Sequence, residues 1–126
     1  MEAQSETKSV LIIDDEQDVV RPVAFRLEVE GFQVSLEPDG QMGYDRAVAE
    51  HPDLILLDVM MPGLDGVTVC NMLKQRVETR GIPIIMVTAK TKMGDVERAF
   101  AAHADDYIAK PFEWSELLAK VRRLIG

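Results

Sequence analysis

Four short apolar runs of the sequence are each followed at once by a side chain that could take part in chemistry: Asp14 with Asp15, Asp58, Thr88 and Lys110. If these side chains meet, the carboxylates repel one another, because two unit charges 4 Å apart interact by about 4 kcal/mol at an effective dielectric of about 20. Lys110 can offset one charge and a divalent cation the others, and all-oxygen ligands favour Mg²⁺ over zinc. A carboxylate nucleophile, a lysine, a hydroxyl and Mg²⁺ together suit phosphoryl transfer.

The apolar runs that precede these residues have the composition of strands. Three of the runs are apolar at every position and consist mostly of Val, Ile or Leu: residues 10–13, 54–57 and 84–87. This composition is typical of strands covered on both faces of a parallel sheet. Residues 32–36 alternate between apolar and polar, as a half-buried edge strand does. Residues 107–109 form a short fifth candidate.

Helical periodicity separates the strands. Apolar residues recur every three or four positions in five segments: Val20 to Leu27, residues 40–50, Val67 to Lys74, Val96 to His103, and Leu117 to Leu124. Pro22 costs about 3 kcal/mol in a helix interior but is tolerated in the first turn. We therefore expect the first helix to begin near Asp18 or Val19, and Gly31 to end it.

Strands and helices alternate five times with short connections. This order predicts an α/β fold of the flavodoxin-like, doubly wound type, with a five-stranded parallel sheet in the order 2-1-3-4-5 and five helices. Ligand sites in such sheets lie beyond the carboxyl ends of the strands. The first, third, fourth and fifth strands would therefore deliver their polar residues to one edge, whereas the second strand, at the side of the sheet, contributes nothing central.

Composition and charge narrow the class of protein. The chain has 126 residues with 14 basic and 22 acidic side chains, a net charge of −8, which argues against binding to nucleic acid or to anionic lipid. The single cysteine, Cys70, cannot form an internal disulfide, and no apolar run approaches the roughly 18 residues of a membrane span. We expect a flexible polar tail over residues 1–8, one domain over residues 9–126, and a cytoplasmic location.

Over residues 9–125 the sequence resembles the receiver domain of bacterial two-component response regulators. The matching motifs are Asp14-Asp15 after the first apolar run, residues 58–66 (DVMMPGLDG), residues 83–89 (PIIMVTA) and residues 104–112 (ADDYIAKPF). They match in residue type, order and spacing. The resemblance implies that a sensor histidine kinase or a phosphotransfer protein donates a phosphoryl group to Asp58.

The resemblance also assigns roles to other residues. Mg²⁺ would be held by Asp14, Asp15 and Asp58, directly or through water, and by the backbone carbonyl of Met60. Thr88 would hydrogen-bond a phosphoryl oxygen and move towards it, and Lys110 would neutralise another oxygen. Tyr107 would turn inward when Thr88 moves.

Further expectations concern conformation and lifetime. The Lys110–Pro111 bond would be cis, and Met60 and Lys90 occupy positions that tune how long the phosphate survives. The family commonly has glycine where this chain has His103, a residue that we interpret as a helix cap rather than a ligand.

Other interpretations weigh against these roles. Taken singly, Asp14-Asp15 could be no more than a helix N-terminus, Thr88 a strand-end residue and Lys110 a surface charge. A haloacid-dehalogenase-like phosphatase needs an acid two residues after its nucleophile, where this chain has Met60, and no Gly-rich nucleotide loop is present. Whether a receiver is called an enzyme is a matter of definition, since it catalyses its own phosphorylation and slow hydrolysis.

The output is left open by the sequence. The chain could act on a separate protein partner, or be the input domain of a larger regulator with an enzymatic or DNA-binding output. A phosphorylation-dependent homodimer is a third arrangement. Trp114, Leu118 and Ile125 form a second apolar stripe on the last predicted helix, which either packs in the core or meets a partner.

Overall fold

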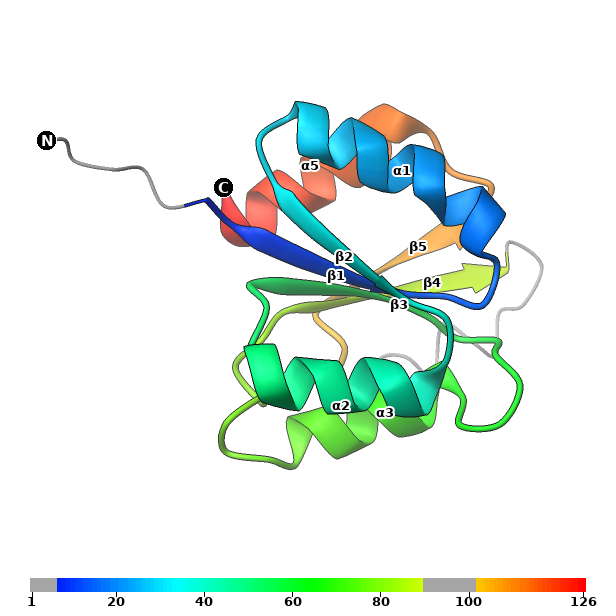
Figure 1. The fold of residues 1–126 in the computed structure, drawn as a ribbon, viewed down its shortest axis with the longest axis vertical. Helices are drawn as coiled ribbons and strands as arrows, with labels where there is room; N and C mark the ends of the chain where they lie inside the picture. The colour runs from blue at the N-terminus through cyan, green and yellow to red at the C-terminus, as the bar shows by residue number, and fades with distance from the viewer. Residues whose placement is uncertain (1–6, 90–101) are drawn as a thin grey trace, which may run out of the picture.

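A computed structural model describes residues 7–89 and 102–126. Its five strands form one parallel sheet in the order β2-β1-β3-β4-β5, which confirms the predicted topology (Figure 1). The expected tail over residues 1–8 lies mostly outside the described residues. The strand bounds are β1 Ser9–Ile13, β2 Gln33–Glu37, β3 Leu54–Asp58, β4 Ile84–Ala89 and β5 Asp106–Lys110.

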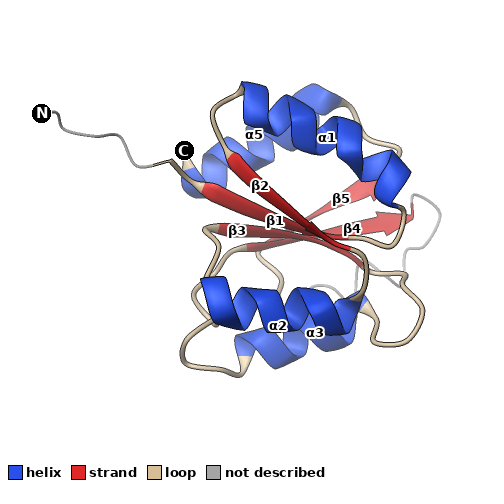
Figure 2. Cartoon of the chain, in the orientation of Figure 1, coloured by secondary structure: helices blue, strands red, loops and turns tan. Residues whose placement is uncertain are grey.

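Helices cover both faces of the sheet. α1 and α5 lie on one face, and α2 and α3 lie on the other (Figures 1 and 2). The described residues contain four helices rather than the five predicted, because the segment expected to form another helix between β4 and β5 falls almost entirely outside them. The bounds are α1 Gln17–Val29, α2 Gly40–Glu50, α3 Gly66–Lys74 and α5 Trp114–Ile125.

Two apolar clusters, one on each face, hold the layers together. Leu11, Ile13 and Leu57 point to the side of α2 and α3, whereas Ile12 and Leu56 point to the side of α1 and α5. This alternation explains why the central strands read as unbroken apolar runs, since both of their faces are covered. Both faces of the sheet are therefore packed behind the residues at its carboxyl edge.

The second apolar stripe of α5 packs in the molecule. Trp114, Leu118 and Ile125 are partly buried against the cluster on the α1 side of the sheet. The Arg26 guanidinium also lies 4.8 Å from the centroid of the Trp114 ring, a cation–π arrangement. Of the two interpretations of this stripe, core packing is the one that these contacts support.

The start of α1 differs from the prediction. The helix begins at Gln17, so Pro22 is its sixth residue and stands in the second turn, not the first. The buried residues of the helix, Val20, Ala24 and Leu27, fix its position against the sheet. Pro22 is exposed, so water can reach the backbone carbonyl that its missing N–H leaves unpaired.

The backbone at His103 has the geometry that a glycine cap would have. Its φ of 68° lies in the left-handed region, which a non-glycine residue adopts at some cost. His103 is exposed, and its capping role stays a prediction because the helix that it would cap falls outside the described residues. Among the residues that the structure describes, no helix is long and apolar enough to cross a membrane.

Candidate functional site

The residues singled out by the sequence converge at the carboxyl edge of the sheet. Strand registers place them at similar heights: Ile13 pairs with Leu57, Asp58 with Val87, and Ala89 with Lys110. Asp14 follows Ile13 directly, and its backbone N–H donates to the Glu37 carbonyl, which extends the β1–β2 ladder by one bond. Parallel pairing therefore brings residues from distant parts of the sequence to one edge.

Lys110 is the positive centre of this edge. Its Nζ lies 3.0 Å from Asp14 Oδ2 and 3.0 Å from Glu16 Oε1, and 3.8 Å from Asp58 Oδ2. Burial lowers the pKa of the ammonium, but the hydrogen bonds to Asp14 and Glu16, together with the charges of Asp58 and Asp14, hold the pKa of Lys110 above its usual value. Lys110 is thus charged and offsets part of the acidic cluster.

The Asp58 carboxyl group has a pKa well above the usual range. Burial, and after it the charge of Asp14, raise the pKa of Asp58 to about 7, against the opposing effects of Lys110 and of the Met60 N–H. The Met60 amide donates to Asp58 Oδ1 at 3.3 Å. A carboxyl group with a pKa so far above the usual range, at a cavity with a charged neighbour, is a functional-site candidate on physical grounds.

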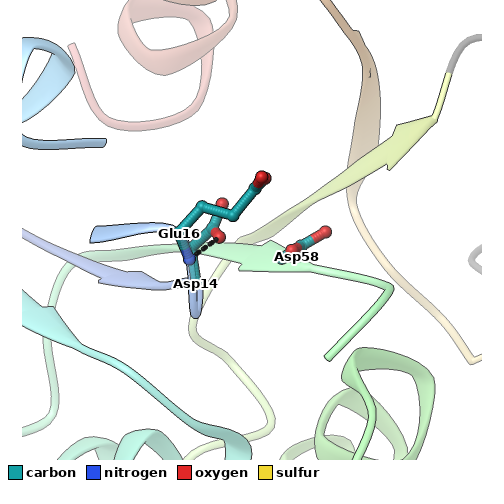
Figure 3. A group of neighbouring side chains, drawn as sticks. All are labelled: Asp14, Glu16 and Asp58. Atoms are coloured by element: carbon teal, nitrogen blue, oxygen red, sulfur yellow. Dashed lines mark hydrogen bonds between the residues drawn. The ribbon is translucent and has the colours of Figure 1, made fainter. Parts of the chain in front are cut away.

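Glu16 joins the site, and the sequence did not single it out. One ligand oxygen from each of Asp14, Glu16 and Asp58 lies within 4.8 Å of the others. Figure 3 shows these three side chains at the carboxyl edge of the sheet. The Glu16 amide donates to Asp14 Oδ1 at 2.8 Å, a local turn that brings the Glu16 side chain back over Asp14 (Figure 3). Asp15, the expected ligand, is exposed and does not belong to this group of oxygens, so its metal role stays a prediction.

The helix-capping explanation of these acids is weakened by the same geometry. Glu16 is the N-cap residue of α1, yet its side chain makes no capping hydrogen bond. Asp39 and Asp65, by contrast, accept from backbone N–H groups at the starts of α2 and α3. Asp14 and Glu16 therefore serve the cluster with Lys110 and Asp58 rather than the helix end.

Thr88 and Tyr107 lie on the other face of the sheet from the acidic cluster. Val87 and Ala89 line the cavity that contains Asp58, so strand alternation turns the Thr88 side chain to the opposite face. Thr88 is buried, and its hydroxyl finds no hydrogen-bond partner among the described residues. Tyr107 packs against the cluster on that same face and pairs with Met86, two residues before Thr88, so the unpaired hydroxyl of Thr88 and the expected aromatic switch share one face of the sheet.

A cavity of about 720 Å³ opens at the acidic cluster and extends beneath the first turns of α1. Its polar end is formed by Asp14, Asp58 and Lys110, and Met60 also contributes to its wall. The Lys110–Pro111 peptide bond, expected to be cis, is cis in the structure. Lys90, expected to tune phosphate lifetime, lies outside the described residues.

The donor set fits a hard divalent cation. All candidate ligand atoms are carboxylate oxygens, and no histidine or cysteine takes part in the cluster formed by the described residues. Carboxylate oxygens are the ligands that Mg²⁺ prefers, whereas zinc favours nitrogen and sulfur. A cation there would also offset the charge of Asp14, which after burial is the next cause of the raised pKa of Asp58.

Comparison with known proteins supports the family that the motifs suggest. Residues 10–122 match the family model of the response regulator receiver domain. The chain is 43% identical over 116 residues to the DNA-binding dual master transcriptional regulator RpaA of Synechocystis sp., covering 92% of this chain and 48% of that protein. It is 38% identical over 117 residues to the response regulator ArlR of Staphylococcus epidermidis, covering 93% of this chain and 52% of ArlR.

Solved structures give the same picture. A putative response regulator from Chloroflexus aurantiacus superposes with a TM-score of 0.91 at 33% identity, covering 94% of this chain and 98% of that one. The receiver domain of the sensor histidine kinase PA1611 from Pseudomonas aeruginosa, solved with a magnesium ion coordinated in its active-site cleft, superposes with a TM-score of 0.88 at 31% identity, covering 96% and 99%. The chain therefore belongs to the response regulator receiver domain family.

Proposed function

We propose that this chain is a cytoplasmic phosphorelay receiver in which Asp58 accepts a phosphoryl group from a phosphohistidine of a sensor kinase or a phosphotransfer protein. The observation that carries the proposal is the setting of Asp58, a buried carboxylate at the carboxyl edge of the sheet, beside Asp14 and 3.8 Å from Lys110. The family membership supports the same reaction.

The reaction balances with the groups present. An Asp58 oxygen forms the new bond to phosphorus, the P–N bond of the phosphohistidine breaks, and the imidazole leaves with a proton from water. The nucleophile must be ionised, and the proximity of Lys110 favours the charged form of Asp58 against the effect of burial. The product is an acyl phosphate, which is reactive enough to serve as a transient signal.

The chain's acids would hold the Mg²⁺ ion that the family uses. Asp14, Asp58 and Glu16 supply the clustered oxygens, and Asp15 and the Met60 carbonyl are further proposed ligands. When bound, Mg²⁺ supplies neutralisation of the charge that develops on the transferred phosphoryl group. Lys110 reaches the same edge and neutralises another oxygen of that group.

Thr88 and Tyr107 would carry the signal away from Asp58. The Thr88 hydroxyl has hydrogen-bonding capacity to offer and must move from its present face to reach a phosphoryl oxygen. That movement would release space beside Tyr107 on the same face. We propose that the β5 and α5 surface then changes its affinity for a downstream partner or for a second copy.

The proposal extends to the output that the receiver controls. The chain spans about half the length of the curated relatives RpaA and ArlR, and RpaA is named as a DNA-binding regulator. This observation favours a regulator in which the receiver controls a DNA-binding segment. The net charge of −8 supports the proposal that any such DNA binding belongs to another segment.

The test is phosphoryl uptake from acetyl phosphate, followed by intact mass. The wild-type chain should gain one phosphoryl group when Mg²⁺ is present and none when Mg²⁺ is chelated. Asp58→Asn should gain no phosphoryl group. Asp45→Asn, which changes an exposed residue of α2, should gain one phosphoryl group as the wild type does. Labelling that persists in Asp58→Asn would place the acceptor elsewhere.

A further inference from the structure

We propose that Met60 is an oxidation site through which peroxide shortens the lifetime of the acyl phosphate on Asp58. The inference rests on the proposed function, since it concerns the regulation of the same site. It joins two observations: the exposure of the Met60 side chain, and its position in the wall of the cavity that contains Asp58.

Methionine oxidation follows the access of the oxidant to sulfur. Among the described methionines, Met60 is 57% exposed and Met42 is 50% exposed, whereas Met72 is half-buried, Met61 is 7% exposed and Met86 is fully buried. Met60 and Met42 are therefore comparably open to a small oxidant such as hydrogen peroxide. Met61, the next residue in the chain, is protected by the core.

The two open methionines differ in what lies beside them. Met60 stands two residues after Asp58, and its amide donates to Asp58 Oδ1 at 3.3 Å. Its side chain contributes to the cavity wall together with Asp14 and Lys110. Met42 is on α2 and does not line that cavity. Of these two methionines, only Met60 would alter the surroundings of Asp58 when it is chemically changed.

The oxidation step is a two-electron oxygen transfer. The Met60 sulfur attacks one oxygen of hydrogen peroxide, the O–O bond breaks, and the other oxygen leaves as water after taking a proton. Sulfur is oxidised and peroxide is reduced, so no further reactant is needed. The product converts a flexible apolar side chain into a polar one, and sulfoxide reductases reverse the change.

The sulfoxide changes the access of water to the site. A thioether is only a weak hydrogen-bond acceptor and shields the carboxyl edge as apolar surface. A sulfoxide oxygen accepts hydrogen bonds strongly and would hold water in the cavity beside Asp58. Hydrolysis then follows when a water oxygen attacks phosphorus and the bond from phosphorus to Asp58 breaks, which gives the free carboxylate and inorganic phosphate.

Cys70 does not compete for this role. It is fully buried, and burial raises the pKa of its thiol to about 11. The thiolate that reacts with peroxide is therefore scarce at neutral pH. Among the described sulfur-containing side chains near Asp58, Met60 is the accessible one.

The experiment measures the decay of the phosphorylated full chain with and without prior exposure to hydrogen peroxide. Peptide mapping should show oxygen added at Met60 and Met42 but not at Met61 or Met86. Peroxide should shorten the phosphoryl lifetime severalfold in the wild type and in Met42→Leu, but should not change it in Met60→Leu. Met60→Gln, which carries a polar acceptor of similar length, should decay faster than Met60→Leu without any peroxide.

Two results would overturn the proposal. One is a wild-type lifetime that peroxide leaves unchanged although Met60 is shown to be oxidised. The other is a peroxide effect that persists in Met60→Leu. Failure of the proposed function looks different, because the untreated wild type would then take up no phosphoryl group at all.

Discussion

The Lys110 ammonium lies 3.8 Å from Asp58 Oδ2, close enough for attraction but beyond hydrogen-bonding distance. Its hydrogen bonds go instead to Asp14 and Glu16. The oxygens of Asp58 are thus stabilised by a nearby charge without being occupied by it. This arrangement leaves Asp58 open to an incoming group and gives Lys110 partners that it must exchange when that group arrives.

Lys110→Ala should make the fold more dependent on Mg²⁺. Asp14 is buried and would lose its cationic partner, so we expect the free energy of unfolding to fall by about 1–3 kcal/mol without metal. A divalent cation should then restore more stability to this variant than it adds to the wild type, because it replaces the missing charge.

Urea unfolding with and without Mg²⁺ measures this difference. Arg46→Ala is the matched control, since it removes a surface cation that pairs with Glu37 and Glu50 away from the site. Its response to Mg²⁺ should equal that of the wild type. Equal stabilisation of Lys110→Ala and the wild type would show that Lys110 and the cation do not offset the same charges.

The raised pKa of Asp58 predicts a pH dependence of stability. The folded state keeps a proton on Asp58 up to its pKa of about 7, whereas the unfolded carboxyl group loses the proton near 3.8, the ordinary pKa of an aspartate. Between these values the folded state binds more protons, so the contribution of Asp58 to stability falls as the pH rises towards 7. Asp58→Asn, which cannot ionise, should therefore gain stability relative to the wild type over that range.

Unfolding of both proteins at several pH values tests this slope, because the other ionisable groups cancel in the comparison. Mg²⁺ should reverse the order at pH 8 by stabilising the wild type more than Asp58→Asn. A difference between the two proteins that stays constant from pH 4 to pH 8 would mean that Asp58 titrates as an ordinary surface carboxyl group.

The sheet could be predicted from the sequence for a definite physical reason. Strands covered on both faces must be apolar at nearly every position, and the runs that end at Ile13, Leu57 and Val87 have this property. Their parallel pairing follows from the helices between them. Once the strand order is known, Asp14 and Asp58 must share an edge, so the main members of the site could be predicted as well.

The details that escaped prediction depend on local backbone geometry. Asp15 and Glu16 are adjacent acids, and the turn in which the Glu16 amide donates to Asp14 Oδ1 decides which one faces Lys110. Periodicity carries no information on such a turn. The prediction for α1 placed Pro22 in the first turn and the helix start near Asp18 or Val19, whereas the helix begins at Gln17 and Pro22 stands in its second turn.

Thr88→Ala should separate stability from response. The Thr88 hydroxyl is buried without a hydrogen-bond partner among the described residues, so its removal should change the free energy of unfolding by no more than about 1 kcal/mol. The stabilisation that beryllofluoride and Mg²⁺ give, as a phosphoryl mimic, should be smaller in Thr88→Ala than in the wild type. Thr88→Ser keeps the hydroxyl and should retain most of the stabilisation by beryllofluoride and Mg²⁺. If both variants lost this stabilisation equally, the effect would belong to the threonine methyl group.

Gly66→Ala should disturb Asp58 through the backbone. A Cβ at Gly66 would collide with the Asp58 carbonyl oxygen and lie 2.8 Å from the Asp58 carbonyl carbon and 2.9 Å from Val59 Cα. These are main-chain atoms, so no side chain can move aside, and relief requires a shift of the end of β3 or of the start of α3. We expect a loss of about 1–3 kcal/mol in the free energy of unfolding.

The same shift should slow phosphoryl uptake from acetyl phosphate, because a displacement of Asp58 changes its distance from Lys110 and Asp14. Gly81→Ala is the matched control: a Cβ there meets no atom within 4 Å and the residue has no left-handed φ. It should unfold and label like the wild type. If Gly66→Ala lost stability but labelled at the wild-type rate, the close packing of α3 on Asp58 would support the fold without positioning the acceptor. A loss of both stability and labelling rate would show that the close packing of the start of α3 on the end of β3 also positions the Asp58 carboxylate.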